Sequence, residues 1–477
     1  LSHSMSQLIF FRGLQGIGGG AIMVQSIAVV GDLFPPAERG KWQGLIGGIF
    51  GIASIAGPLT GGWITDNVSW RYVFYINIPL GIIAFSVIAW AMPKIIPEIR
   101  KRSIDYAGAV LLAMALVPLL LAMVWGGSEY EWTSPVIIGL IIFSAAMAVA
   151  FGAAENRAKE PILPLTLFHN RVFSTSRAAI LFSSMGLFGA IIYIPLFAQG
   201  VIGVSATNSG LILMPLMLGM VVSSVISGQL ISRTGKYKKL GIIGMAVTLI
   251  GMLLLSRMSP ETTATTLRIN MVMTGTGLGI TMPIFMVVVQ SAFDHSHLGQ
   301  VTAASQLFRS IGSTVGTAVL GGLLNSQLSD KLSGLSGNEF VQGMQQLNPQ
   351  SQFDKIDASA LQNLLSEPGQ AQVRASLAQA PAAAQEKLAT GFNDFVEVLK
   401  VAFASSIGTL FIASTIITLL ALVAVFFLPE IELRKTNKSA MEEAGMELES
   451  ELAVSDSDHE PDLYPVGDDN NGDKPVP

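Results

Sequence analysis

Arg12 and Arg309 stand inside long apolar stretches of this 477-residue chain, and an arginine in that setting is a candidate functional residue. Arg12 opens the run Arg12-Gly-Leu-Gln15-Gly16-Ile-Gly18-Gly19-Gly20, and Arg309 lies in Gln306-Leu-Phe-Arg309-Ser-Ile-Gly312. A guanidinium in hydrocarbon costs at least about 2.5 kcal/mol unless it faces a cavity or a partner. We therefore expect Arg12 and Gln15 to belong to a functional motif, and Arg309 to take part in coupling. Snorkelling of the long side chain to the membrane surface is the competing explanation for both arginines.

Glycines at helical spacing form a second set of candidates. Gly16 and Gly20 are four residues apart, which places them on one helix face where another backbone can approach closely. Further along, the segment Ala53 to Gly62 combines a proline with closely spaced glycines: Gly57, Pro58, Gly61 and Gly62. Proline leaves a backbone carbonyl unpaired and kinks a helix, while glycines permit close packing at the kink. Both segments are expected where helices pack closely.

A tight basic turn joins two apolar stretches later in the chain. The run Gly228 to Lys239 contains Gly228, Arg233, Gly235 and Lys236. The preference for positive charge in cytoplasmic loops explains the basic residues, but it does not explain the spacing of the two glycines. We expect Arg233 to pair with Asp294 and so to close a cytoplasmic gate.

The elements that position these residues are membrane-spanning helices. Hydrophobic residues make up 51% of the chain and charged residues only 13%, about half the charged share of soluble domains. A helix needs about 20 apolar residues to cross the hydrocarbon. Eleven segments meet this requirement: Leu8–Gly31, Trp42–Thr65, Tyr72–Met92, Tyr106–Trp125, Pro135–Ala154, Phe173–Gln199, Gly210–Ser232, Leu240–Ser256, Leu267–Ser291, Val301–Leu324 and Val401–Leu428. None alternates as the strands of a membrane barrel do, so the predicted fold class is an all-α polytopic membrane protein.

Lysines and arginines in the connections predict the orientation of these helices. Sixteen lie on one side and only three, Arg71, Arg257 and Arg268, lie on the other, leaving aside the long connection 326–400. Cytoplasmic loops carry the excess of positive charge. We therefore expect a multi-pass protein of the plasma or inner membrane, with the first residue outside and the C-terminus in the cytoplasm.

An internal repeat organises the spans. Shifting the chain by 259 residues aligns the first two spans with the ninth and tenth without a gap, and six glycines coincide. Parallel repeats are typical of transporters in which two helical halves rock about a midplane site. Three spans precede the second copy and none precedes the first, which predicts that about three helices are absent before Leu1. The expected domains are the remainder of an N-terminal six-helix bundle (1–92), two inserted linker helices (93–160), a C-terminal six-helix bundle (161–429) with an outer loop (326–400), and a disordered acidic cytoplasmic tail (430–477).

The outer loop and the tail differ from the rest in composition. Residues 430–477 hold fourteen acids and four bases, so the net charge of −5 divides into −10 for the tail and +5 for the remainder. The tail has too few large apolar residues to fold alone, although a peptide that binds a partner is an alternative. The outer loop is too polar to span the membrane and forms either a small external cap or a mobile loop.

The residue types also limit the chemistry. The chain contains no cysteine, which excludes disulfides, thiolate nucleophiles and Cys-based metal sites. No nucleophile–base pair or metal cluster is visible, so neither an enzyme nor a bound cofactor or metal is expected. No Asp or Glu lies in the middle of a span. A proton-coupled carrier needs a titratable group that alternates between the two sides. Asp66 is a poor candidate, and we expect the coupling acid in the absent helices.

The motifs together resemble the major facilitator superfamily, in its fourteen-helix drug:proton antiporter branch. Arg12 to Gly20 resembles the family's fourth-helix motif, Ala53 to Gly62 its antiporter motif, and Gly228 to Lys239 the second copy of its loop motif. Asn67 to Pro79 and Asp105 to Gly108 are similar to the branch's outer loop and to the start of its extra helix pair. The chain departs from the family pattern with Ala53 in place of glycine and Ser232 in place of aspartate. The resemblance implies a bundle of two pseudo-repeated halves with eleven of an expected fourteen helices present.

The resemblance also implies a function. We expect proton-driven export of lipophilic or cationic small molecules by alternating access, by a monomer that contacts lipid and binds no nucleic acid. Methionines and aromatic side chains suit a promiscuous site because they repack around varied ligands. The implied cavity residues are Met23, Gln25, Phe188, Tyr193, Asn270, Met273, Met282 and Gln290. Ordinary helix packing or lipid contact is the alternative role for each. A dedicated exporter of one metabolite, such as a siderophore, antibiotic or lipid, and an inactive membrane fragment are the alternatives for the whole chain.

Overall fold

The computed structural model describes residues 2, 4–91, 105–127, 129–203, 212–293, 297–333, 364–365, 367–377 and 382–433, apart from a few side chains within helices. These ranges are helical, with a lone bridge between Gly126 and Tyr130. Eleven of the described helices are long and apolar enough to cross a membrane. The prediction of an all-α polytopic protein with eleven spans is therefore confirmed.

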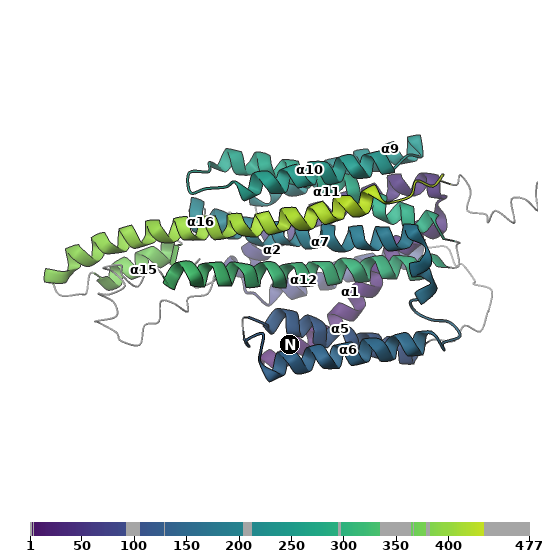
Figure 1. Ribbon diagram of the computed structural model, residues 1–477, viewed down its shortest axis with the longest axis horizontal. Helices are drawn as coiled ribbons and strands as arrows, with labels where there is room; N and C mark the ends of the chain where they lie inside the picture. The colour runs from purple at the N-terminus through teal and green to yellow at the C-terminus, as the bar shows by residue number, and fades with distance from the viewer. Residues whose placement is uncertain are drawn as a thin grey trace, which may run out of the picture. The chain divides into compact units, whose positions relative to one another are not determined.

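The helices follow one another as long rods with short connections (Figure 1). The first part of the chain forms α1 (Met5–Leu33), α2 (Pro36–Asn67), α3 (Tyr72–Tyr75), α4 (Asn77–Ala91), α5 (Tyr106–Trp125) and α6 (Pro135–Glu155). After the short helix η1 (Leu165–His169), the second part forms α7 (Arg171–Phe197), η2 (Ala198–Ile202), α9 (Met214–Thr234), α10 (Lys238–Ser256), α11 (Ala264–Ser291), α12 (Leu298–Ser333), α15 (Glu367–Leu377) and α16 (Ala382–Phe426).

Local sequence signals explain where several of these helices begin and end. The side chains of Asp105, Ser134 and Asn170 each accept a backbone N–H bond in the first turn of α5, α6 and α7, which satisfies donors that a helix leaves unpaired at its start. Gly235 caps the end of α9, and its φ of 66° is a left-handed conformation that favours glycine. The position of Gly235 in the basic turn is therefore explained by its backbone conformation.

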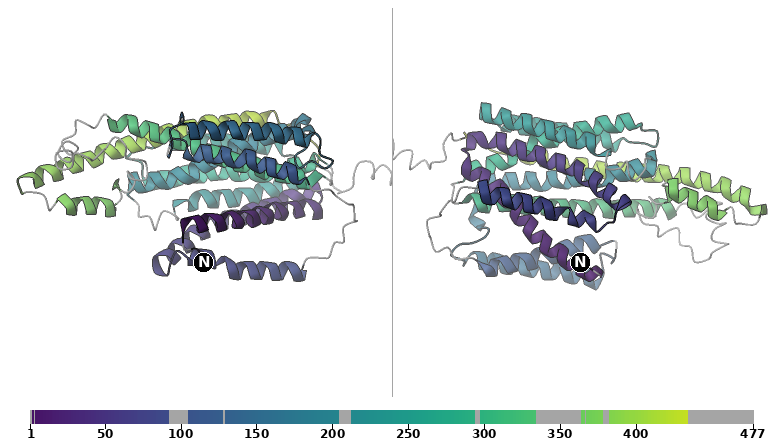
Figure 2. Two further views of the ribbon diagram at one scale, coloured as in Figure 1. Left: turned by 90° about the horizontal axis from the view of Figure 1, so that it is seen from below. Right: turned by 180° about the vertical axis from the view of Figure 1, so that it is seen from behind.

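The described core lies among the helices of the second part. α9, α10 and α11 pack together, while α7 and α12 run side by side and α16 contacts both α7 and α10 (Figures 1 and 2). α2 packs along α9 and α11, and α1 contacts α12. α5 and α6 form a hairpin, joined by a 2.6 Å hydrogen bond from Ser144 to the carbonyl oxygen of Ala115, and α5 also contacts α12. No residue of α4 is buried.

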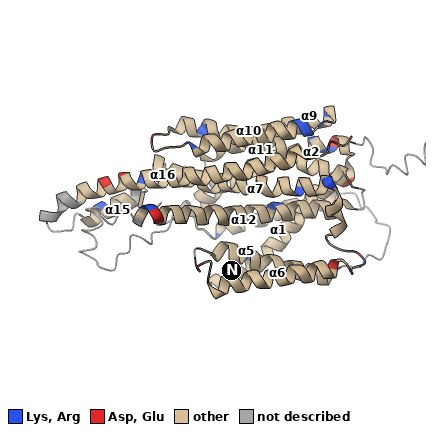
Figure 3. Ribbon diagram, viewed as in Figure 1, with Lys and Arg blue, Asp and Glu red and all other residues tan. Residues whose placement is uncertain are grey.

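The two ends of the bundle differ in charge. Arg39, Arg171, Arg233 and Lys238 all lie at helix ends that meet on one side, here named the basic end (Figure 3). The opposite side, where α5 ends and α6 begins, is named the distal end. α12, α15 and α16 extend beyond the other helices at the distal end (Figure 1).

The distal extension corrects the expected bounds of the outer loop. α12 continues to Ser333, and α16 begins at Ala382 rather than near Val401. The reason is helical periodicity, because apolar residues recur every three or four positions and bury one face of each helix. Leu328 and Leu332 of α12 are buried in one cluster with Leu377 of α15 and with Phe392 and Leu399 of α16. The parts of the predicted outer loop that belong to α12, α15 and α16 therefore form a packed cap at the distal end.

Candidate functional site

The basic end is closed by a crossing of two helices that touch through glycine. A Cβ added at Gly40 of α2 would lie 2.8 Å from the carbonyl oxygen of Gly228 in α9, and one at Gly44 would lie 2.6 Å from that of Ser224. Real Cβ atoms essentially never approach another heavy atom this closely. Gly228, predicted from the basic turn, thus allows the backbones of α2 and α9 to meet. Its partners Gly40 and Gly44 were not among the predicted gate residues.

Arg39 adds a polar latch beside this crossing. Its guanidinium donates to three main-chain carbonyls: from Nε to Phe34 at 2.9 Å, from Nη1 to Gln290 at 2.7 Å and from Nη2 to Gly31 at 2.8 Å. Arg39 is 3% exposed, so the bonds form away from water, where an unpaired guanidinium would be costly. Because Gln290 belongs to α11, the latch ties the α1–α2 turn to the second part of the chain.

Gln290 extends the latch with its own side chain. Its Nε2 donates to Thr302 Oγ1 at 3.1 Å and to the carbonyl of Ile27 at 3.4 Å, so that α1, α11 and α12 meet at one amide. The sequence singled out Gln290 as a cavity residue, whereas the structure places it, 1% exposed, inside the closed basic end.

The basic turn between α9 and α10 is anchored by a tyrosine. Tyr237 donates from its hydroxyl to the carbonyl of Pro429 at 2.7 Å and accepts from the N–H of Ile431 at 2.8 Å. Burial raises the pKa of Tyr237 to about 12, with the nearby Glu430 adding to the rise and the Ile431 bond opposing it. Arg233 and Lys236 are exposed beside this anchor. Asp294, the expected partner of Arg233, lies outside the described residues.

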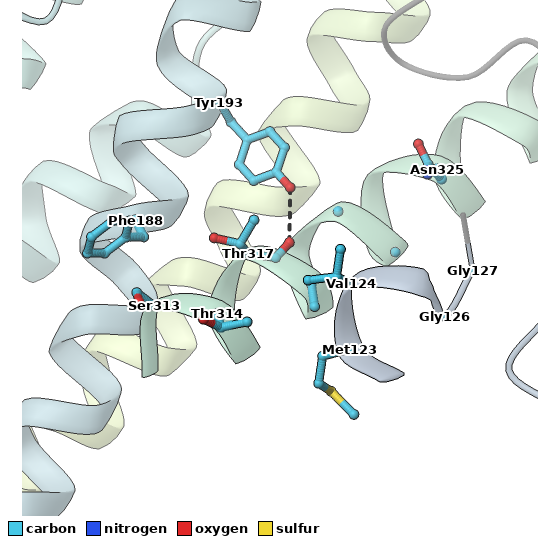
Figure 4. Close-up of a pocket in the computed structure, with 13 residues that line it drawn as sticks. Met123, Val124, Gly126, Gly127, Phe188, Tyr193, Ser313, Thr314, Thr317 and Asn325 are labelled. Atoms are coloured by element: carbon cyan, nitrogen blue, oxygen red, sulfur yellow. Dashed lines mark hydrogen bonds between the residues drawn. The ribbon is translucent and has the colours of Figure 1, made fainter. Parts of the chain in front are cut away.

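A cavity of about 430 Å³ lies toward the distal end, between α5, α7 and α12 (Figure 4). Phe188 and Tyr193 of α7, both predicted cavity residues, line one side of it, and Met123 and Val124 of α5 line another. α12 contributes small and hydroxyl-bearing residues: Ser313, Thr314, Thr317, Ala318, Gly321, Gly322 and Asn325. The Tyr193 hydroxyl donates to the carbonyl of Thr317 at 3.2 Å. The walls combine apolar surface with a few hydrogen-bonding groups, as small-molecule sites do.

A second hollow, of about 290 Å³, brings together two residues of the first motif. Arg12 and Gln15 line it with Trp70, Phe74 and neighbouring residues of the segment that connects α2 to α4. The Arg12 guanidinium donates to Gln15 Oε1 at 2.7 Å and lies 5.8 Å from the centre of the Phe74 ring. Arg12 is exposed. The side-chain amide of Gln15 and the ring of Phe74 therefore hold the Arg12 guanidinium in place.

The other predicted residues lie apart from these two hollows. Apart from the adjacent residues and the nearby backbone of the same helix, no described atom comes within 4 Å of a Cβ built at Gly16, Gly20, Gly57 or Gly62, and at Gly61 the nearest is Val73 at 4.0 Å. α2 continues as helix through Pro58 and Asp66, whose side chains lie outside the described set. Met23 contacts the Gln306 amide, Asn270 donates to the carbonyl of Leu254, Met273 is half-buried, Met282 faces Gly47 across the α2–α11 contact, and Gln25 is exposed.

One buried charge was missed by the sequence interpretation. Arg177 of α7 is 1% exposed and contacts α12. Like Arg309, Arg177 is an arginine inside an apolar span. The pattern that identified Arg309 in the sequence could therefore have identified Arg177 as well. Arg309 is half-buried on α12.

These features define a class of protein: a polytopic helical membrane protein, closed at one end and hollowed toward the other, as carriers of small molecules are. Residues 1–317 match the family model of the Major Facilitator Superfamily. The chain belongs to this superfamily, and it is therefore a transporter rather than an enzyme.

The chain is similar to relatives with assigned names. The chain is 37% identical over 470 residues to the multidrug transporter protein MdtP of Bacillus subtilis, covering 96% of this chain and 82% of the relative. It is 38% identical over 344 residues to Multidrug resistance protein 3 of the same organism, covering 71% of this chain and 66% of the relative. A crystal structure of a bacterial homolog to the human lysosomal transporter Spinster aligns over 86% of both chains with 12% identity and a TM-score of 0.39, which is too loose to inform the site.

Proposed function

We propose that this chain exports lipophilic or cationic small molecules from the cytoplasm in exchange for protons. The observation that carries the export proposal is the pairing of a closed basic end with a distal cavity. The glycine crossing and the Arg39 latch close one end, while Phe188, Tyr193 and the hydroxyls of α12 line a hollow toward the other. We propose that this arrangement is one state of an alternating-access cycle, with the distal cavity between α5, one of the predicted linker helices, and α7 and α12 of the C-terminal bundle.

The sidedness of the proposal rests on charge. Positive residues accumulate in cytoplasmic loops, and the basic end carries Arg39, Arg171, Arg233 and Lys238. We therefore assign the basic end to the cytoplasm, which makes this state outward-facing and the distal cap external. The C-terminal tail then lies in the cytoplasm. Export suits this state because a cargo held in the distal cavity leaves directly to the outside.

Similarity to two relatives named for multidrug transport and multidrug resistance supports a broad cargo range. The distal cavity supports it physically, since the flexible side chain of Met123 fits ligands of varied shape and the ring of Phe188 offers an aromatic face to cations. Proton coupling is the more specific part of the proposal, and it rests on the antiporter-like motifs. We propose that Arg12 and Arg309 take part in proton coupling, with Asp66 as a minor candidate.

Growth protection tests the proposal. The chain is expressed in a bacterial host that lacks its own efflux pumps, and growth is measured against a panel of dyes and drugs with and without a protonophore. We expect protection against several unrelated compounds, lost when the protonophore collapses the gradient. Protection that survives the protonophore would contradict proton coupling. A narrow protection profile would favour a dedicated exporter of one metabolite. Absence of protection with the protein present in the membrane would favour an inactive chain.

A further inference from the structure

Arg177 is the most deeply buried charge of α7, and its surroundings leave part of it unused. The side chain is 1% exposed, and the face of its guanidinium lies 4.9 Å from the centre of the Phe173 ring. Its Nη1 donates to the carbonyl of Val301 at 3.2 Å and to the hydroxyl of Ser305, both on α12. One face and one nitrogen are therefore engaged, and these contacts fix the orientation of the group.

The remaining edge of the guanidinium has no partner among the described residues. Nε and Nη2 of Arg177 are both buried without a hydrogen bond. These two nitrogens share one edge of the planar group and point their N–H bonds in parallel. Such a fork matches the two oxygens of a carboxylate or phosphate. A buried charge without a partner is costly, so an unengaged fork in a fixed orientation indicates a ligand.

A second arginine lies on the face of α12 that Arg177 contacts. Val301, Ser305 and Arg309 are spaced by four residues on α12 and so share one helix face. Arg309, one turn beyond Ser305, therefore lies on the side of α12 that Arg177 contacts. Neither arginine forms an ion pair within the described part of the chain. Two neighbouring cations without a described counter-charge attract an anion between them, since it relieves both the repulsion and the desolvation.

We propose that Arg177 and Arg309 form a binding site for an oxyanion, a carboxylate or phosphate group, between α7 and α12. The Nε and Nη2 edge of Arg177 binds two oxygens, and Arg309 supplies the second charge. Two sources carry this chemistry: a free anion, and the phosphodiester of an acidic lipid. Neither arginine lines the distal cavity, and the site requires neither export nor proton coupling.

Binding to the purified full chain tests the proposal without measuring transport. The protein is placed in nanodiscs of phosphatidylcholine, and its thermal midpoint Tm is followed during titration with sodium phosphate or sodium acetate, with sodium chloride at equal ionic strength as reference. We expect a saturable rise of Tm, because a ligand that binds only the folded state stabilises it. Arg177→Gln and Arg309→Gln should each abolish the rise or weaken the apparent affinity at least about tenfold. Arg268→Gln, which removes an exposed arginine of α11, should leave it unchanged.

A second arm identifies the source of the anion. The same proteins are compared in nanodiscs of phosphatidylcholine alone and of phosphatidylcholine mixed with phosphatidylglycerol. A Tm rise from phosphatidylglycerol that Arg177→Gln removes, with no response to free anions, assigns the site to a lipid headgroup. A response to phosphate or acetate alone assigns it to a free anion. Both outcomes support the site.

Arg177→Lys is a further control in case Arg177→Gln fails to fold. The lysine keeps the positive charge but lacks the two parallel N–H donors. We expect it to bind more weakly than the unchanged chain and more strongly than Arg177→Gln. The proposal is overturned if phosphate, acetate and phosphatidylglycerol shift Tm equally in the unchanged chain and in the Arg177 and Arg309 variants. It is also overturned if none of the three shifts Tm of the unchanged chain.

Discussion

Arg39 and Gln290 lie 251 residues apart in the chain, yet the guanidinium of one donates to the backbone carbonyl of the other at 2.7 Å. The bond forms at the basic end, where α2 and α11 meet beside the glycine crossing of α2 and α9. Because Arg39 also binds the carbonyls of Phe34 and Gly31, it fixes the α1–α2 turn against the second part of the chain. A transporter that closes this end must break these bonds to open it.

Removing the latch should expose the basic end. The chain has no cysteine, so Ser291→Cys gives a single labelling position, 8% exposed, next to Gln290. We expect Arg39→Gln to increase its rate of maleimide labelling several-fold, because a glutamine cannot reach three carbonyls. Arg257→Gln, at the distal end, is the matched control and should leave the rate unchanged. Equal labelling in all three backgrounds would show that Arg39 does not hold the end closed.

The glycine crossing should tolerate no methyl group at its centre. Gly44→Ala places a Cβ 2.6 Å from the Ser224 carbonyl oxygen, whereas Gly48→Ala, one turn further along α2, meets its nearest atom at 3.4 Å. Overpacking of this kind costs about 1–3 kcal/mol. We expect Gly44→Ala to lower Tm clearly more than Gly48→Ala and to reduce transport. Similar Tm values for the two variants would argue against a close crossing.

The distal cavity should set which compounds are exported. Phe188→Ala removes an aromatic wall of the cavity, and Phe143→Ala removes an exposed ring of α6 that does not line it. We expect Phe188→Ala to change the relative protection against large and small dyes, with each shifted by several-fold. Phe143→Ala should keep the original profile. An unchanged profile in both variants, at equal protein levels, would remove the cavity from the transport path.

Tyr237 should contribute stability that persists to high pH. Tyr237→Phe removes both bonds that the hydroxyl makes to Pro429 and Ile431, at about 0.5–1.5 kcal/mol each. The pKa of Tyr237 is raised to about 12 from an ordinary value near 10, so folding favours the neutral hydroxyl. Its contribution is therefore complete below about pH 10 and is lost as pH rises toward 12. We expect a constant Tm difference between the unchanged chain and Tyr237→Phe from pH 7 to about 10. A difference that vanishes near pH 8 would contradict the raised pKa.

The predicted gate pair can be tested by charge reversal. Arg233 is exposed at the end of α9, and Asp294 lies outside the described residues. If the two pair, Arg233→Asp and Asp294→Arg should each reduce transport, and the double variant should recover a substantial part of it. Lys236→Asp combined with Asp294→Arg serves as the control, because a neighbouring charge should not restore the lost activity. A double variant no better than either single reversal would exclude the pairing.

The eleven spans were predictable because a span needs only length and apolar content, and both can be read from the sequence. The capping residue Asn170 and the terminal Gly235 likewise follow from local chemistry. The distal cap was predicted only as one of two alternatives. Its helices are stabilised because residues such as Leu332 and Phe392 are buried in one cluster, and that burial depends on which amphipathic faces meet.

The gate was harder to predict than the helices. Arg39 binds backbone carbonyls, which every residue has, so nothing in the sequence distinguishes its partners. From the sequence, Arg39 was only one of the sixteen basic residues that predict the orientation of the helices. Gly228 was recognisable by its spacing, but its contact with Gly40 joins segments 188 positions apart, and no local pattern encodes that meeting. Phe188 and Tyr193 meet at the distal cavity, while Asn270 bonds to Leu254 in the packed interior, because residue type alone does not fix which side of a helix faces a hollow.

α16 is one uninterrupted helix of 45 residues, and at about 1.5 Å per residue it measures about 68 Å, roughly twice the hydrocarbon thickness of a bilayer. Its distal part packs in the cap, and the remainder packs against α7 and α10. A stiff rod with one end outside the bundle acts as a lever. An antibody fragment that binds the cap more tightly in one state of the transporter than in another would therefore favour that state, without any contact with the cargo.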